Sequence, residues 1–336
     1  MIIARAPLRI PLGGGGTDLP SYYSLYGGEW ISAAINKYIY IILNKRFENT
    51  LRISYSKTEE VNTPEEVEHP IVREALKMLN IDGGIELVSI ADIPSQTGMG
   101  TSGSFTVALL TALYGYLRNN IKKDLPPRQQ IAEEACHIAM DILKEPSGKQ
   151  DEYIAAFGGI TAFEANQKGE VKVTPFYPLQ FSDINLRELE NNLLMFYTGI
   201  RRESREALKI QKEATQKNDG DMIENLHHIK EIGREIKKAL IKGDFHRFGE
   251  LMDEHWQEKS KRKGTVNEQI KHWYQVAKEA GAIGGKLMGA GGGGFFLFYC
   301  EDKNKPKLRA AMQTEGLREE VFRFDLEGVK IIGDFS

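Results

Sequence analysis

Runs of β-branched and aromatic residues, separated by short polar or glycine-containing stretches, fill the chain up to residue 91. Tyr38–Phe47 is the clearest run, because such side chains fit the pleated surface of a strand better than a helix. Strands are predicted over Ile2–Ala6, Leu8–Leu12, Glu29–Asn36, Tyr38–Phe47, Leu51–Tyr55 and Gly84–Ala91. A helix is predicted from Pro70 to about Asn80, since proline is tolerated in a first helical turn.

From residue 102 onward, helical periodicity alternates with short apolar strands. Helices are predicted over Ser102–Arg118, Pro127–Lys144 and most of 204–280, and strands over Gly159–Ala165, Glu170–Thr174, Leu193–Tyr197, Gly284–Met288, Gly294–Tyr299, Glu320–Phe324 and Val329–Ile332. Pro175–Arg187 contains two prolines and weak periodicity, which marks a domain boundary. No steady β-α-β alternation is present. We therefore predict an α+β fold with an N-terminal domain over 1–180 and a C-terminal domain over 181–336.

Composition and charge narrow the functional classes. The net charge of −3 lacks the basic excess on which nucleic-acid binding relies, and Lys259–Lys263 is interpreted as a solvated helix end. Cys136 and Cys300, the two cysteines, lack the spacing of a disulfide framework or a zinc site. The start of the chain does not resemble a signal peptide, and no apolar run is long enough to cross a bilayer. A cytoplasmic location with no membrane or nucleic-acid partner is expected.

The segment GMGTSGS, Gly98–Ser104, has the G-x-G-x-x-G spacing of a dinucleotide-binding loop. However, Pro94–Thr97 separates it from the preceding strand, and a polar, proline-containing stretch replaces the second strand that a dinucleotide fold needs. A Walker P-loop is excluded as well, because the nearby Gly148-Lys149 pair lacks the first glycine and the following hydroxyl residue.

The remaining interpretation of this segment is a phosphate loop that opens a helix. Small residues leave backbone amides accessible, the helix N-terminus attracts anions, and hydroxyls can reach phosphate oxygens or Mg²⁺. The residues expected to bind phosphate are Gly98, Gly100, Thr101, Ser102, Gly103 and Ser104.

Two further glycine-rich loops support a ligand with close backbone contacts. Gly13–Gly16 lies between Arg9 and Asp18, and Gly289–Gly294 lies between two predicted strands, where it is expected to brace the phosphate loop. Three such loops in one chain favour close approach of the backbone to a ligand over loose hairpins.

Together these segments resemble the three signature motifs of the GHMP small-molecule kinases, in the family's order. Pro94–Ser102 is similar to the family's P-x-x-x-G-L-G-S-S, with Met99 for Leu and Thr101 for the first Ser. The resemblance implies an N-terminal domain like ribosomal protein S5 domain 2, a ferredoxin-like C-terminal domain and a site between them. It also implies ATP and Mg²⁺ as cofactors of a phosphotransferase with an alcohol acceptor.

Within that family, stretches such as AINKYIY, HPIVREAL and GKQDEYIAAFGG resemble the bacterial heptose 7-phosphate kinases. This implies a sugar phosphate as substrate and phosphorylation of its anomeric hydroxyl to a 1,7-bisphosphate. Another sugar 1-kinase such as an L-fucokinase, a non-catalytic sugar or nucleotide sensor, and an S5-like RNA-binding module are the alternatives. The oligomeric state is left open, with a homodimer as one option.

The same resemblance assigns catalytic roles. Asp151 in GKQDEY matches the family's catalytic base, and Arg9 matches the arginine beside it. Asp18, with Gly15 and Thr17 of the same loop, is expected to contact the sugar. The alternatives are that Asp151 and Asp18 cap helices and that Arg9 is a surface arginine.

The metal site and the anchor for the sugar's own phosphate are less defined in sequence. Ser102 is expected to bind Mg²⁺, and Asp141 is the candidate second ligand, since Ala139 stands where relatives have glutamate. The candidate cationic anchors for the sugar phosphate are Arg201 and Arg202 first and Lys149 second. A solvated arginine pair, and an ion pair of the lysine with Asp151, are their alternative roles.

Overall fold

The computed structural model describes residues 1–121, 124–201, 205–262, 266–289 and 291–335, and its first sheet is built on two long strands. β1 (Ile2–Gly13) and β2 (Gly28–Lys45) pair antiparallel along most of β1. Each replaces two shorter predicted strands. Pro7 and Pro11 do not end β1, because both lie beside irregularities of the pairing register, where a missing ladder donor is tolerated.

The first sheet has eight strands in the order β12-β1-β2-β5-β3-β4, with β6 on β2 and β7 on β6. β2 is long enough to serve two neighbours: residues 28–33 pair with β6, and residues 39–45 pair with β5. The other strands of this sheet are β3 (Leu51–Ser54), β4 (Thr58–Val61), β5 (Ile85–Ala91), β6 (Ile160–Ala165), β7 (Val171–Pro175) and β12 (Lys330–Asp334). β4 was not predicted, since its buried side chain is Glu59 rather than an apolar residue.

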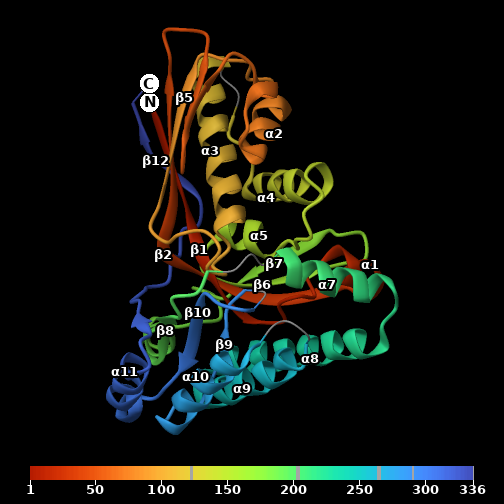
Figure 1. Cartoon of the computed structure of the whole chain (residues 1–336), viewed down its shortest axis with the longest axis vertical. Helices are drawn as coiled ribbons and strands as arrows, with labels where there is room; N and C mark the ends of the chain where they lie inside the picture. Colours follow the sequence, from red (N-terminus) through yellow and green to blue (C-terminus); the bar gives the residue numbers. More distant parts are fainter. Residues whose placement is uncertain (122–123, 202–204, 263–265, 290, 336) are drawn as a thin grey trace.

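Helices cover one face of this sheet (Figure 1). α3 (Thr101–Ile121) packs along β1 and β2 and buries residues 107–113, which are apolar apart from Thr111. Beside it lie α2 (Pro70–Met78), α4 (Arg128–Cys136) and α5 (Gln150–Phe157). The predicted helix Pro127–Lys144 is an α-helix only to Cys136 and continues as a π-helix over His137–Ile142.

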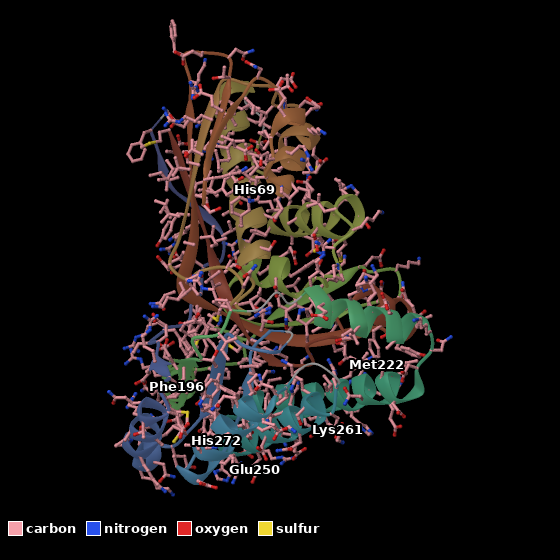
Figure 2. The ribbon with its side chains drawn as sticks, in the orientation of Figure 1. His69, Phe196, Met222, Glu250, Lys261 and His272 are labelled. Carbon is pink, nitrogen blue, oxygen red and sulfur yellow. The ribbon has the colours of Figure 1, made fainter. Side chains whose placement is uncertain are left out.

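The second sheet is antiparallel, in the order β11-β8-β10-β9. Its strands and helices are β8 (Leu193–Tyr197), β9 (Gly284–Leu287), β10 (Phe295–Tyr299), β11 (Arg318–Glu319), α6 (Asp183–Asn192), α7 (Arg205–Gln216), α8 (Gly220–Lys242), α9 (Phe245–Ser260), α10 (Glu268–Glu279) and α11 (Lys305–Thr314). One face of this sheet packs into a separate core that includes Phe196 (labelled in Figure 2), Phe298 and Trp256. The other face, with Met195 and Leu297, belongs to the core of the first sheet. α6 lies in the predicted boundary and was not predicted, because Leu189 is its one buried residue.

The last strand returns to the first sheet. β12 pairs antiparallel with β1 over Ile2–Arg5, and Ile331 packs against α3 at Gly115. The predicted domain 181–336 therefore does not coincide with the second sheet, since residues 330–334 complete the edge of the first. The predicted strand Glu320–Phe324 makes one isolated bridge instead. No helix in the described part of the chain combines the length and apolar character that a membrane span requires.

Candidate active site

The glycine-rich loop before α3 is held by backbone packing. Gly98 and Gly100 have φ of +76° and +74°, a conformation that residues with a Cβ rarely adopt. A Cβ on Gly98 would lie 2.8 Å from the Met288 carbonyl oxygen, and one on Gly289 would lie 2.7 Å from the Gly98 Cα. The loop at 289 thus braces the loop at 98, and the first amides of α3 face the cleft for an anionic ligand.

The hydroxyl residues of this loop differ in direction. Thr101 and Ser102 line the cleft together with Gly98, Gly100 and Gly103. Ser104 is fully buried, and its Oγ donates to the Pro7 carbonyl at 2.7 Å. The prediction that Ser104 contacts phosphate is wrong for its side chain, because the helix turns this residue toward β1.

Arg9 and Asp151 form an ion pair in the cleft, although 142 residues separate them in sequence. Arg9 Nε and Nη2 each lie 2.7 Å from Asp151 Oδ1, and Nη1 donates to the Gly98 carbonyl. The Arg9 side chain is 6% exposed and that of Asp151 is 31% exposed, so the carboxylate keeps an accessible side. The side chain of Asp151 does not cap α5, whose N-cap residue is Lys149.

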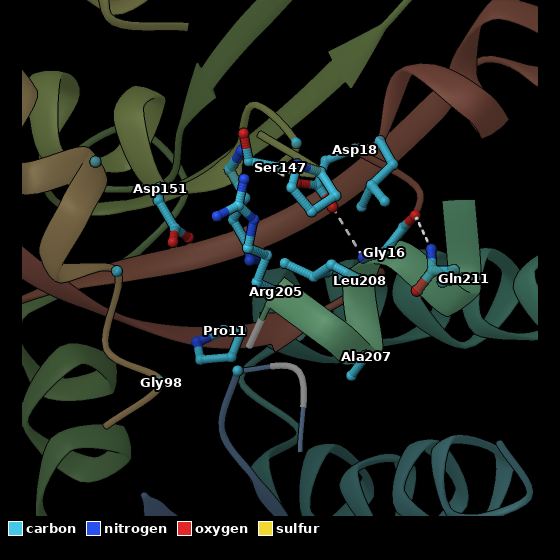
Figure 3. Close-up of a pocket in the computed structure, with 18 of the residues that line it drawn as sticks. Pro11, Gly16, Asp18, Gly98, Ser147, Asp151, Arg205, Ala207, Leu208 and Gln211 are labelled. Atoms are coloured by element: carbon cyan, nitrogen blue, oxygen red, sulfur yellow. Dashed lines mark hydrogen bonds between the residues drawn. The ribbon is translucent and has the colours of Figure 1, made fainter. Parts of the chain in front are cut away.

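Asp18 lies at another part of the same cleft, as Figure 3 shows. Its Oδ1 accepts a hydrogen bond from the Gly16 amide at 2.8 Å, and Oδ2 accepts one from the Gln150 amide at 3.2 Å. Burial raises the pKa of the Asp18 carboxyl, against the effect of the Gly16 hydrogen bond, and Asp151 raises it further. Asp18 does not cap α1 (Pro20–Tyr26), whose N-cap residue is Leu19.

Gly15 and Thr17, the two other residues predicted in this loop, differ in their exposure to the cleft. Gly15 lines the cleft. Thr17 is fully buried, and its Oγ1 lies 2.8 Å from the carbonyl oxygens of both Gly14 and Glu29. The predicted sugar contact through Thr17 is therefore wrong, because its hydroxyl holds the loop onto β2.

Three polar atoms near Asp18 and Asp151 are buried and have no hydrogen-bond partner among the described residues. They are Ser147 Oγ, Gln150 Oε1 and Glu152 Oε2, all from cleft-lining residues. Burial, with the nearby Asp151 charge, raises the pKa of Glu152 to about 8. Buried polar atoms are costly when unpaired, so this part of the cleft suits a ligand with several hydrogen-bonding groups.

Basic side chains of the C-terminal half line the cleft beneath these residues. We call His255, Lys259, Arg262 and Lys286 the cationic wall. The Lys286 side chain comes from β9, is 1% exposed, and its Nζ lies 3.3 Å from the Leu12 carbonyl oxygen. Burial, and then the charge of Arg9, lowers the pKa of Lys286 to about 7.

Among the described residues, Lys259 and Arg262 of the cationic wall donate hydrogen bonds to backbone or amide oxygens, whereas His255 does not. Lys259 Nζ donates to the Leu287 carbonyl at 2.9 Å, and Arg262 Nη1 donates to Gln211 Oε1 at 3.0 Å. His255 is 2% exposed, and neither ring nitrogen has a hydrogen-bond partner in the described part of the chain. Burial lowers the pKa of this imidazole well below its usual value.

Comparison with known proteins identifies the family. Residues 69–159 match the model of the GHMP kinases N-terminal domain, and residues 236–317 match that of the GHMP kinases C-terminal domain. A D-glycero-alpha-D-manno-heptose 7-phosphate kinase of Campylobacter jejuni is 30% identical over 98% of both chains. The chain is a GHMP kinase.

Other relatives agree with this assignment. A crystal structure of a D-glycero-D-manno-heptose 1-phosphate kinase from Bacteroides thetaiotaomicron is 26% identical, with a TM-score of 0.80 over 100% of both chains. The L-fucokinase/L-fucose-1-P guanylyltransferase of Bacteroides fragilis is 25% identical and covers 90% of this chain, which matches 35% of that protein. The predicted two-domain GHMP kinase fold is confirmed, and the relatives support an ATP-dependent phosphotransferase acting on a sugar.

Several predicted site residues of this GHMP kinase lie away from the cleft. Lys149 Nζ lies 2.7 Å from Glu133 Oε2 and 2.8 Å from the Gly169 carbonyl oxygen, so its expected roles toward substrate or Asp151 are wrong. Asp141 is exposed on the π-helix, where its Oδ2 lies 2.8 Å from His137 Nδ1, and it is not a cleft-lining residue.

The arginine anchor finds no support in the described residues. Arg201 is exposed and does not line the cleft, whereas Arg205 at the start of α7 does. Arg202 lies outside the described residues.

The cationic wall was missed because Lys259–Lys263 was interpreted as solvated. Lys261 is exposed as expected, but Lys259 is 8% exposed. A signal was present: Met252, His255, Trp256 and Lys259 follow the i, i+3, i+4, i+7 spacing of one helix face, and all four are buried.

Proposed function

We propose that this GHMP kinase transfers the γ-phosphoryl group of ATP to the anomeric hydroxyl of D-glycero-D-manno-heptose 7-phosphate, giving the 1,7-bisphosphate. The observation that carries the proposal is the Arg9–Asp151 pair, which joins the glycine loop at 98 to the cleft that contains Asp18. The similarity to the Campylobacter enzyme over nearly the whole chain supports the choice of sugar.

Phosphoryl transfer requires a proton acceptor, positive charge beside the transferring group and a site for the ATP phosphates, and different residues supply each of these. Asp151 accepts the proton of the anomeric hydroxyl as the new O–P bond forms and the bond to the leaving ADP oxygen breaks. Arg9 fixes the Asp151 carboxylate and adds positive charge beside the transferring group. The amides at the start of α3, with the Thr101 and Ser102 hydroxyls, bind the ATP phosphates.

Sugar hydroxyls would meet the polar atoms around Asp18. Its carboxylate, together with Ser147 Oγ and Gln150 Oε1, offers both acceptors and a donor at one end of the cleft. Two of these groups are buried without a partner, which is the arrangement expected when a ligand completes their hydrogen bonds.

The donors present also fit Mg²⁺, which prefers oxygen ligands and usually keeps contacts to substrate phosphates and water. The Ser102 hydroxyl and the buried, unpaired Glu152 Oε2 are the candidate protein ligands, in place of the predicted Asp141. The described residues contain no group of three or more side chains typical of a dedicated metal site. When bound, Mg²⁺ would neutralise part of the charge on the ATP phosphates.

A sugar 1-kinase for a phosphate-free sugar is the second candidate, favoured by the similarity to part of the L-fucokinase/L-fucose-1-P guanylyltransferase of Bacteroides fragilis. The two candidates differ in the charge of the substrate. The heptose 7-phosphate proposal requires a second anion-binding region in the cleft, whereas a neutral sugar requires none.

The test is ATP consumption measured against a panel of heptose 7-phosphate, unphosphorylated heptose, L-fucose, galactose and mevalonate. We expect the highest kcat/KM with heptose 7-phosphate and loss of that activity in Asp151→Asn. A higher kcat/KM with L-fucose or another neutral sugar would overturn the heptose assignment while leaving a sugar kinase.

A further inference from the structure

Within the cationic wall, Lys286 and His255 are buried and have fewer polar partners among the described residues than their side chains can use. Lys286 and His255 are 1% and 2% exposed and line the cleft. In the described part of the chain, Lys286 has one hydrogen bond, the 3.3 Å contact to a carbonyl, and no ion pair, while the imidazole has neither. Burying a cation without a carboxylate or a hydrogen-bonded network is expensive.

Arg9, in the same cleft, shows the opposite arrangement. Its guanidinium is also buried, but it makes two 2.7 Å contacts to Asp151. A cation meant only for structure could have been paired in the same way. Lys286 and His255 are therefore placed to complete their contacts with an anion that arrives with a ligand.

Two members of the cationic wall, Lys286 and Arg262, lie beside the loop that follows β1. Lys286 reaches the carbonyl of Leu12 at the end of β1, and Arg262 approaches the loop that follows β1. A Cβ on Gly16 would lie 3.3 Å from Arg262 Nη1. Gln211 connects the two residues, because its Oε1 accepts a hydrogen bond from Arg262 and its Nε2 donates one to the Gly16 carbonyl. Lys286 and Arg262 thus lie along the loop that leads from β1 to Asp18, whereas Lys259 donates to the Leu287 and Gly289 carbonyls.

We propose that the cationic wall, His255, Lys259, Arg262 and Lys286, anchors the phosphate that the sugar substrate already carries. This inference rests on the proposed function and names the group that distinguishes a sugar phosphate from a neutral sugar. A phosphate brings about two negative charges and several strong acceptors, which suit two ammonium groups, a guanidinium and an imidazole. Binding of the phosphate would give Lys286 and His255 the polar partners that the described residues do not supply.

The main experiment compares Lys286→Met with Lys261→Met, a matched substitution at an exposed lysine just after α9 (Figure 2). For Lys286→Met we expect KM for heptose 7-phosphate to rise about ten- to a hundredfold, the effect of one lost charge-assisted contact. KM for ATP and the activity on unphosphorylated heptose should change less than about threefold, and Lys261→Met should change nothing. An equal fall of kcat on both sugars would overturn the proposal, because it would place Lys286 at the transferring phosphoryl group.

His255→Gln gives a second, milder variant that keeps one N–H donor in place of the ring. We expect a smaller rise of KM for the sugar phosphate, again with KM for ATP unchanged. An unchanged KM for the sugar phosphate in both Lys286→Met and His255→Gln would move the anchor out of the cationic wall.

A binding experiment with inorganic phosphate separates this inference from the proposed function. Phosphate should raise the melting temperature of the parent enzyme and of Lys261→Met, and should raise that of Lys286→Met much less. It should also compete with the sugar phosphate rather than with ATP. If heptose 7-phosphate proved not to be a substrate, this result would still support an anion site while the heptose assignment failed. Equal stabilisation of all three proteins, or competition with ATP alone, would overturn the site and leave the kinase function intact.

Discussion

Two buried lysines near the cleft, Lys149 and Lys286, have opposite surroundings. Lys149 is 5% exposed, and its ammonium contacts both carboxylate oxygens of Glu133 and the Gly169 carbonyl. Lys286 is 1% exposed, and its one polar contact among the described residues is the Leu12 carbonyl oxygen at 3.3 Å. A buried lysine with its own carboxylate belongs to the framework, whereas one without a carboxylate in a ligand cleft indicates a place where charge is supplied from outside.

The same contrast applies to the acidic groups of the cleft. The Asp151 carboxylate is satisfied by Arg9, while Glu152 Oε2 has no partner among the described residues. A charged group that is paired within the protein, such as Asp151, is thus held in position for the reaction, whereas an unpaired one, such as Glu152, is available to bind a ligand or a metal ion.

Breaking the Arg9–Asp151 ion pair should have the largest effect on activity. Asp151→Asn keeps the shape of the side chain but removes the proton acceptor and leaves Arg9 without its counter-charge. We expect kcat to fall by about 10²–10⁴-fold, with ATP affinity nearly unchanged. Steady-state kinetics together with calorimetric titration of an ATP analogue provide the measurement. A variant with near-normal kcat at saturating substrates would remove Asp151 from the chemistry.

The lowered pKa of Lys286 predicts that the stability of the protein rises with pH. The pKa of Lys286 is about 7 in the folded protein against an ordinary 10.5. Between these values the unfolded chain binds more protons, so the stability contributed by this group rises as pH increases from 7 to 10.5.

Urea unfolding of the parent and of Lys286→Met at both ends of this range measures that contribution. Because Met cannot titrate, the difference in unfolding free energy between the two proteins should change by on the order of a few kcal/mol, in favour of the parent at high pH. A constant difference across the range would show that burial does not suppress the charge of Lys286.

Replacing Lys149, the lysine that is paired with Glu133, should lower the stability of the protein by a smaller amount. Lys149→Met leaves Glu133 without its ammonium partner, and the Glu133 side chain is 38% exposed, so water compensates part of the loss. We expect the free energy of unfolding to fall by about 1–3 kcal/mol, with kcat/KM within a few-fold of the parent. A large rise in KM for the sugar with unchanged stability would instead restore Lys149 as a substrate contact.

Arg201→Ala should have the smallest effect. Arg201 is exposed and does not line the cleft. KM for the sugar phosphate should stay within about twofold and the unfolding free energy within about 0.5 kcal/mol, as for most surface substitutions. A tenfold rise in KM would return the anchor to the segment before α7.

Local patterns were sufficient for the elements whose apolar residues repeat clearly. β8 agrees with the predicted Leu193–Tyr197, and the Arg9–Asp151 pair forms as the family motifs predicted. β4 and α6 were missed because each buries little apolar surface, and the joining of the predicted strand pairs into β1 and β2 depends on neighbouring strands.

The directions of individual side chains could not be predicted in the same way. Ser104 and Thr17 have residue types suited to ligand binding, but tertiary packing turns both inward. The cationic wall is assembled from α9, the residues after it and β9, so no single segment carries its pattern. A charged residue in an apolar period, such as Lys259 or Lys286, was the available indication.

The return of β12 to β1 gives the protein a mechanical property. The chain leaves the first sheet after β7, enters the second through α6 and β8, and crosses back between β11 and β12. Two covalent connections therefore join the halves on either side of the cleft. The hydrophobic core also continues between the halves, since Phe295 and Leu297 of β10 belong to the same cluster as Leu8 and Ile10 of β1. Two connections and a shared core resist twisting of one half against the other more than a single linker would.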